Sequence, residues 1–123
     1  DKKHLFRYAG ETENYTAGNQ RTTFEVKGWK ICPLICYDLR FPEWARNRFD
    51  RAGNAEYDLL VYTANWPTPR ISHWEMLLKA RAIENQACVV GVNRVGNDGN
   101  GVPYSGCSAA IDHMGRELCS KKN

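Results

Sequence analysis

The residue best placed for chemistry in this sequence is Cys36. It ends an apolar run that begins at Trp29 and predicts a buried strand. Asp38, Arg40 and Glu43 follow closely, ahead of a predicted helix. A thiol between a strand and a helix has the context of a nucleophile elbow, where a sharp turn exposes the side chain. The alternative is a buried, inert cysteine, and the charged flank favours the nucleophile.

A cysteine nucleophile needs activation, because the unperturbed pKa of its thiol is about 8.5. A nearby ammonium group lowers that pKa, and a carboxylate can take the proton. The backbone N–H of Tyr37, the next residue, could point toward a developing oxyanion. The local sequence alone does not identify the lysine or the acid. The other four cysteines lie in apolar or turn segments and are expected to be packing residues: Cys32, Cys88, Cys107 and Cys119.

The cysteine and histidine pattern argues against a metal site or a disulfide framework. The five cysteines are odd in number and irregularly spaced, the sequence has no Cys-x-x-Cys pair, and the three histidines are far apart. A redox-active or metal-binding cysteine protein is therefore the least favoured hypothesis. We expect no metal and no cofactor. Free thiols fit the reducing cytoplasm best.

Composition and charge exclude several classes of protein. The 123 residues suffice for one domain, and 42% hydrophobic with 11% aromatic residues is typical of a folded chain. A net charge of +3 is too mild to predict nucleic-acid binding. No apolar run approaches the ~18 residues of a membrane helix. The chain starts at Asp1 without a methionine, so we expect a fragment.

The pattern of apolar residues predicts alternating strands and helices, and hence α/β architecture. The most clearly periodic helix spans 72–86, where Ser72 and Glu75 predict a capping box. Two prolines make 65–69 a loop, and 112–115 reads as a hairpin turn. The predicted strands are 22–26, 29–36, 57–64, 88–93, 105–111 and 116–120, and a second, shorter helix is predicted over 42–51.

Several segments, in order along the chain, resemble the nitrilase, or carbon–nitrogen hydrolase, superfamily. The run Cys-Tyr-Asp-Leu-Arg-Phe-Pro-Glu from Cys36 looks like the nucleophile motif of that family. The opening Lys2–Phe6 resembles its lysine motif. Glu11 falls where the family has a glutamate ahead of a Pro-Gly turn, although Ala17 replaces the proline here. The stretch 74–85 is similar to the helix that comes after the nucleophile strand.

The resemblance implies a Glu–Lys–Cys triad. Cys36 would attack a carbonyl or nitrile carbon to form a thioester or thioimidate. Lys2 would stabilise the oxyanion together with the Tyr37 N–H, and Glu11 would orient Lys2 or water. The general-base glutamate of the family lies upstream of the lysine motif and so outside this chain. The implied fold is a four-layer α-β-β-α sandwich, of which 1–123 would be the central and C-terminal portion of a single domain.

Two further segments resemble the ω-amidase branch of the superfamily, namely 65–74 and 93–101. That branch implies cleavage of the terminal amide of a small α-keto acid amide, with release of ammonia. Asn65 and Trp66 would then line the substrate pocket, although Trp66 could equally be a packed loop aromatic. Alternatives are a carbamoylase, a nitrilase or a catalytically silent piece. The family also implies a homodimer or higher oligomer.

The charged residues after Cys36 allow two interpretations. Asp38, Arg40 and Glu43 could form ion pairs that shape the elbow, which we favour. Arg40 could instead hold a substrate carboxylate through two parallel hydrogen bonds. Glu84 is expected to pair with Arg81 or another neighbour.

Overall fold

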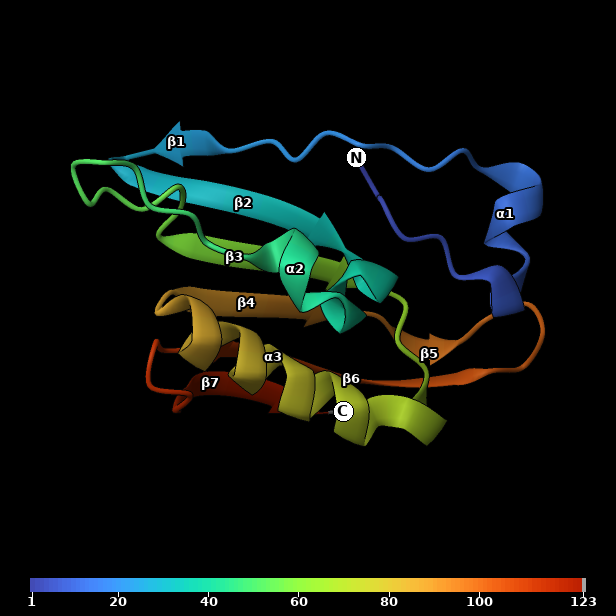
Figure 1. Cartoon of the computed structure of the whole chain (residues 1–123). Helices are drawn as coiled ribbons and strands as arrows, with labels where there is room; N and C mark the ends of the chain where they lie inside the picture. Colours follow the sequence, from blue (N-terminus) through green and yellow to red (C-terminus); the bar gives the residue numbers. More distant parts are fainter. Residues whose placement is uncertain (123) are drawn as a thin grey trace.

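A mixed β-sheet with helices against one face forms the computed structural model, which describes residues 1–122 (Figure 1). Within these residues the strands run in the order β1-β2-β3-β4-β6-β5, and β7 also pairs with β6. The strands are β1 Phe24–Val26, β2 Trp29–Ile35, β3 Leu59–Ala64, β4 Cys88–Asn93, β5 Val95–Asn97, β6 Pro103–Ile111 and β7 Glu117–Lys122. The helices are α1 Glu11–Asn14, α2 Pro42–Ala45 and α3 Ile71–Asn85, with short 3-10 turns η1 Arg7–Ala9, η2 Cys36–Arg40 and η3 Thr68–Arg70.

Three neighbouring strands, β2, β3 and β4, are parallel, and the other pairings are antiparallel. Because the carboxyl ends of parallel strands meet at one edge of a sheet, the residues that follow them come together there. Cys36 follows β2, Asn65 follows β3 and Arg94 follows β4. The N-terminal segment with α1 also lies beyond this edge (Figure 1).

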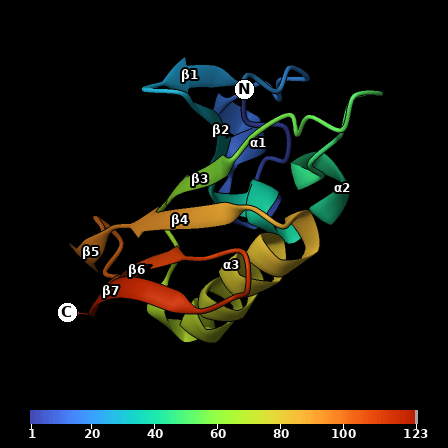
Figure 2. The ribbon, with the colours of Figure 1, turned by 90° about the vertical axis from the view of Figure 1, so that its left-hand side faces the viewer.

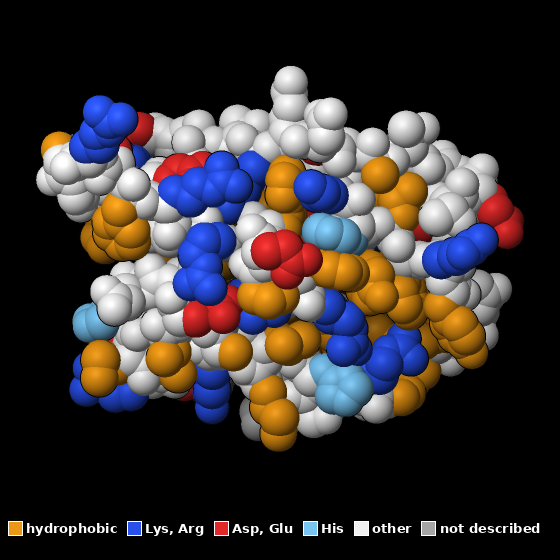
Figure 3. Space-filling model, in the orientation of Figure 1, with side chains coloured by type: hydrophobic (Ala, Val, Ile, Leu, Met, Phe, Trp, Pro, Cys, Tyr) orange, Lys and Arg blue, Asp and Glu red, His pale blue; other side chains and the backbone are white. Residues whose placement is uncertain are grey.

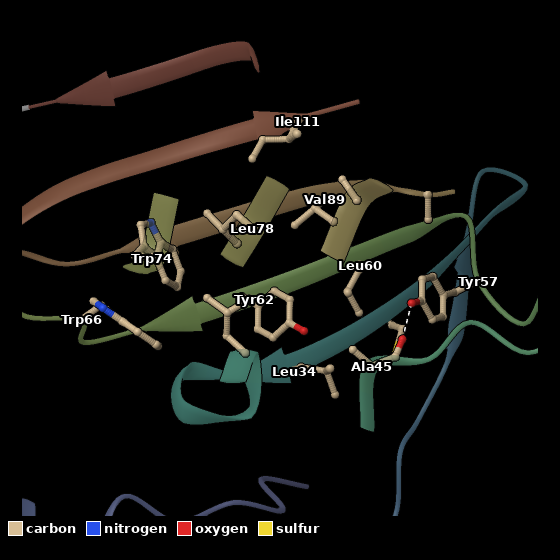
Figure 4. Packing of buried hydrophobic residues seen from close by; sticks show 14 of the residues in the cluster. Leu34, Ala45, Tyr57, Leu60, Tyr62, Trp66, Trp74, Leu78, Val89 and Ile111 are labelled. Carbon is tan, nitrogen blue, oxygen red and sulfur yellow. Dashed lines mark hydrogen bonds between the residues drawn. The ribbon is translucent and has the colours of Figure 1, made fainter. Parts of the chain in front are cut away.

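The main core lies between the sheet and helix α3. Figure 2 shows α2 and α3 on the same side of the strands, and Figure 4 shows Trp74 and Leu78 of α3 packed over Leu60 and Tyr62 of β3. All four are at most 1% exposed. Each such side chain contributes about 1.5–3 kcal/mol by burial. A Cβ atom on Gly91 would lie 2.5 Å from a methyl of Leu78, so glycine is required where α3 crosses β4.

The opposite face of the same strands is also apolar but is partly exposed. Side chains alternate between faces along a strand, and every second residue of β2 to β4 lies on this side. Ile35 is 39% exposed and Val92 is 50% exposed. Apolar residues on both faces are typical of parallel strands that are covered on both sides. The remaining members of this face are Ile31, Pro33, Leu59, Val61, Cys88 and Val90.

Two predictions about helices were wrong in detail. The helix predicted over 42–51 ends at Ala45, because Arg46 leaves the helical region at ψ 120°. The buried Asn47 then holds the chain extended by bonding both the N–H and the carbonyl of Tyr57. Helix α3 begins at Ile71, directly after η3, so Ser72 lies inside the helix and does not cap it.

The strand predictions are confirmed apart from their ends. The first strand starts at Phe24. The strand predicted over 105–111 starts earlier, at Pro103, and the last strand reaches Lys122. The hairpin turn at 112–115 is confirmed, since one carboxylate oxygen of Asp112 accepts the N–H groups of Met114 and Arg116. Strand β5 was missed, because its glycine and asparagine residues look like part of a turn.

Candidate active site

Cys36 sits on a sharp turn at the carboxyl end of β2, as the elbow interpretation predicted. It is the first residue of η2, and its φ of 47° lies in the left-handed region. Such a conformation costs a non-glycine residue about 1–3 kcal/mol and is concentrated at functional sites. The thiol is half-buried, with Sγ 4.0 Å from the carbonyl oxygen of Asn65. The turn after Cys36 is a 3-10 turn, and the α-helix follows only at Pro42.

The surroundings of Cys36 act on its thiol in opposite directions. Burial raises the pKa of Cys36 above its usual value. The Lys2 ammonium is the strongest opposing influence, and backbone groups of Asn65 and Tyr37 lower the pKa as well. Glu11 raises it. Lys2 is therefore the charge that most favours the thiolate, in the direction that activation by a nearby ammonium requires, while burial has the larger effect.

Lys2 and Glu11 form a close ion pair beside the thiol. The Nζ of Lys2 lies 2.5 Å from Oε2 of Glu11, and their side chains are 13% and 26% exposed. The same oxygen accepts the N–H of Phe6 at 2.7 Å. Glu11 is thus fixed at the start of α1, where Gly10 adopts a φ of 72°. The structure brings Lys2, Glu11 and Cys36 together on one cavity wall.

Asp38 joins the lysine segment to the nucleophile turn. Its carboxylate is fully buried and accepts the backbone N–H of His4 at 2.8 Å and that of Ile35 at 3.3 Å. The His4 Nδ1 lies 2.9 Å from the same carboxylate, and the His4 ring stacks on Phe41 with centroids 3.6 Å apart. Lys2 is two residues from His4, so this carboxylate fixes the position of Lys2 relative to Cys36.

Of the ion pairs expected for Asp38, Arg40 and Glu43, only the contact of Asp38 with the His4 ring is found among residues 1–122. Asp38 is engaged with His4, and Arg40 instead lies 2.9 Å from Nδ1 of His73. The Arg40 guanidinium also lies over the Trp66 ring, 5.0 Å from its centroid. The partners could not be predicted from the local sequence, because His4 lies 34 residues from Asp38 and His73 lies 33 residues from Arg40. The predicted pair of Arg81 and Glu84 is confirmed at 3.0 Å.

Two adjoining hollows open at Cys36. A narrow pocket of about 30 Å³ and a larger open cavity of about 820 Å³ both include Phe6, Cys36, Asn65 and Arg70 in their walls. The narrow pocket is completed by Tyr37, Arg40, Trp66 and Pro67. The larger cavity also reaches Arg94 ahead of β5, Asp98 in the turn after it and Tyr104 on β6.

The predicted substrate residues Asn65 and Trp66 both lie at the pocket. Trp66 is only 3% exposed and packs against Trp74 with centroids 5.6 Å apart. Its indole N–H donates to the carbonyl of Arg70 at 2.8 Å. The Trp66 ring is therefore packed in the core and also contributes to the wall of the narrow pocket.

Sequence reasoning missed Asn93, Phe6 and Arg70 as parts of this site. The buried Asn93 holds the 65–67 loop, accepting the N–H of Trp66 at 2.7 Å and donating to its carbonyl at 3.0 Å. A usable signal existed, because Asn93 ends a parallel strand at the same edge as Cys36. Nothing in the local sequence distinguishes Phe6 or Arg70.

The described chain also bears on metal and membrane binding. Within residues 1–122 no three His, Cys, Asp or Glu side chains gather closely enough to hold a metal ion. The five cysteines are free. None of the helices described here has the length and apolar character needed to cross a membrane.

Comparison with known proteins decides the family. The sequence model of the carbon–nitrogen hydrolases matches residues 1–122. The chain belongs to the carbon–nitrogen hydrolase family. It is 58% identical over 120 residues to Omega-amidase YafV of Escherichia coli (strain K12), covering 98% of this chain and 44% of that protein. It is 43% identical over 117 residues to 2-oxoglutaramate amidase of Bacillus subtilis (strain 168), covering 95% and 43%.

A solved carbon–nitrogen hydrolase structure extends the likeness to the fold. A mutant of the amidase from Nesterenkonia sp. AN1, with acrylamide added at its active-site cysteine, superposes with a TM-score of 0.85. It is 26% identical, and the match covers 98% of this chain and 46% of that one. The predicted α/β fold of this family is confirmed. The chain spans less than half the length of these relatives.

Proposed function

We propose that this chain supplies the nucleophilic part of a thiol amidohydrolase that removes the terminal amide of a small α-keto acid amide. The observation that carries the proposal is the Lys2–Glu11 pair set beside Cys36 on its strained turn. The likeness to an ω-amidase and to a 2-oxoglutaramate amidase supports the substrate class. The acrylamide adduct in the Nesterenkonia amidase supports a cysteine nucleophile.

The proposed reaction has two halves. A general base takes the thiol proton of Cys36, and the thiolate attacks the amide carbon. The base returns that proton to the nitrogen, which the tetrahedral intermediate expels as ammonia, leaving a thioester. Water then attacks the thioester and releases the carboxylic acid and the thiol. Lys2 and the Tyr37 N–H stabilise the oxyanion in both halves. Losing one such donor raises the barrier by about 3–4 kcal/mol.

Proton transfer needs a base besides Glu11, because the carboxylate of Glu11 is already bonded to Lys2 and to the N–H of Phe6. We propose that a glutamate outside this chain performs this role. In this view 1–123 is the central and C-terminal portion of a single carbon–nitrogen hydrolase domain. The 44% coverage of the E. coli relative supports that assignment.

The proposal also covers the cellular compartment, the oligomeric state and the substrate contacts of the enzyme. Five free thiols favour the cytoplasm. A homodimer or higher oligomer is supported by exposed apolar side chains on and beside α3, where Met76 is 69% exposed, Ile83 54% and Met114 62%. Asn65 and Trp66 would contact the substrate amide end, since both line the pocket that holds the thiol.

The test replaces the thiol in the full-length protein. We expect Cys36→Ala to reduce ammonia release from 2-oxoglutaramate by at least about 1,000-fold, since the covalent route is lost. Cys119→Ala is the matched control, because Cys119 is an exposed thiol on β7, and it should keep parental activity. Parental turnover by Cys36→Ala would refute the proposal. Faster turnover of a nitrile or a carbamoyl amino acid than of 2-oxoglutaramate would favour the nitrilase or carbamoylase alternative.

A further inference from the structure

Three arginines surround the two hollows at Cys36, and two of them are engaged with neighbours. Arg40 is bonded to His73 and lies over Trp66. Arg94 donates to the carbonyl of Asn97 at 3.2 Å and lies over the Tyr104 ring. Figure 3 shows basic side chains gathered beside hydrophobic ones over η2 and the start of α3. The region beside the thiol is therefore positively charged.

Arg70 differs from the other two in having an unsatisfied guanidinium. Among residues 1–122 that group makes no hydrogen bond or ion pair; it lies over the Phe6 ring, 5.6 Å from its centroid. Its backbone is held firmly, with its N–H donating to Pro67 at 3.0 Å and its carbonyl accepting the Trp66 indole. Arg70 is also the one arginine that lines both the narrow pocket and the large cavity with Cys36.

The carboxylates of the cavity wall do not neutralise Arg70. Glu11 is paired with Lys2. Asp98 accepts the N–H groups of Asn100 and Val102 and the hydroxyl of Tyr104, and these bonds lower the pKa of its carboxyl. Both acids thus have their own donors. A guanidinium held over a ring, with its N–H groups free, is suited to a planar carboxylate bound through two parallel hydrogen bonds.

We propose that Arg70 binds the carboxylate at the far end of the substrate while the amide carbon lies at Cys36. The inference rests on the proposed amidase function and sharpens it. The enzyme would select ω-amides of short dicarboxylic acids, because only these carry an amide and a carboxylate at opposite ends. Arg70 would be a specificity-determining residue, acting on binding and not on the chemical step.

The test uses two amides that differ only at the far end, in the full-length enzyme. Glutaramate ends in a carboxylate, and pentanamide ends in a methyl group at the same position. We expect the parent enzyme to prefer glutaramate in kcat/KM. Arg70→Gln should reduce that preference by about 10- to 100-fold, mainly through KM, since charge-assisted hydrogen bonds are lost. Arg70→Lys should recover part of it, because lysine keeps the charge but lacks the planar fork.

The matched control is Arg48→Gln, an exposed arginine beside a different surface hollow, which should keep the parental preference. A preference in Arg70→Gln within about twofold of the parent would overturn the inference. So would a loss of preference in Arg40→Gln alone, which would assign the carboxylate to Arg40. A parent enzyme that hydrolyses both amides equally would refute the carboxylate subsite and leave the amidase intact. A parent that hydrolyses neither these amides nor 2-oxoglutaramate would refute both.

Discussion

Cys32 lies on β2 and Cys36 directly follows that strand, but the two thiols occupy opposite chemical environments. Residues four apart in a strand point to the same side, so extended backbone throughout would bury both thiols. Cys32 is fully buried in the helix-covered core. At Cys36 the backbone turns to a φ of 47° and the thiol reaches the pocket with Lys2 nearby. A single backbone rotation thus separates a packing residue from the proposed nucleophile.

Burial raises the pKa of both thiols, but different groups oppose it. The pKa of Cys32 rises to about 11, with Arg21 as the main opposing charge. The pKa of Cys36 is raised too, but there Lys2 and two backbone groups oppose the rise. The two thiols therefore differ in the groups that oppose the effect of burial, and at Cys36 the Lys2 cation and two backbone groups favour the thiolate.

The largest expected difference between the two thiols is in alkylation. In the full-length protein at pH 8, we expect iodoacetamide to label Cys36 more than about 100-fold faster than Cys32, because Cys32 has almost no thiolate and is reached only when the core opens. Peptide mass spectrometry over a time course would measure both rates. Equal labelling rates for Cys36 and Cys32 would contradict the expected difference between the two thiols.

The contrast between these cysteines could be predicted from sequence only in part. The apolar run 29–36 indicated a buried strand, and the charged flank singled out the end of it. The sharp turn was inferred from context and is confirmed. The partners of Asp38 could not be predicted, because His4 lies 34 residues away and only tertiary structure brings it near. The family resemblance, and not local sequence, identified Lys2 and Glu11.

The layers of the fold were predictable for a different reason. Strands β2 to β4 are apolar on both faces, and a continuous apolar pattern of this kind is typical of parallel strands. Helix α3 was found from its periodicity, but its start was misplaced because a 3-10 turn, Thr68–Arg70, leads into it without a side-chain cap. Arg70, the last residue of that 3-10 turn, was missed because a single arginine has no distinguishing pattern until the fold places it beside Cys36.

The second difference concerns stability in alkaline solution. The unfolded chain loses the Cys32 proton near pH 9, whereas the folded chain keeps it to about pH 11. Above pH 9 the unfolded state therefore binds fewer protons, and the free energy of unfolding falls as pH rises. Complete titration would cost about 2–3 kcal/mol. We expect Cys32→Ala to be less stable at pH 7 but to lose less stability between pH 9 and 11, as measured by urea unfolding. Identical pH slopes in parent and variant would contradict the assigned pKa.

The smallest effect tests what makes Cys36 reactive. Replacing Lys2 with methionine keeps much of the side-chain volume and removes the charge that lowers the pKa of Cys36. We expect Lys2→Met to raise that pKa and to slow Cys36 alkylation about 10-fold at pH 8, because a smaller fraction of the thiol is then ionised. The labelling of Cys32 should not change.

Lys3→Met is the matched control, because Lys3 is the adjacent lysine and its Nζ lies over the Trp44 ring, 4.4 Å from the centroid. Lys3→Met also removes one positive charge from this segment, but it leaves Lys2, the partner of Glu11, in place. If both variants slowed Cys36 equally, general electrostatics of the N-terminal segment would explain the reactivity. If only Lys2→Met did, the specific ammonium held by Glu11 is what separates Cys36 from Cys32.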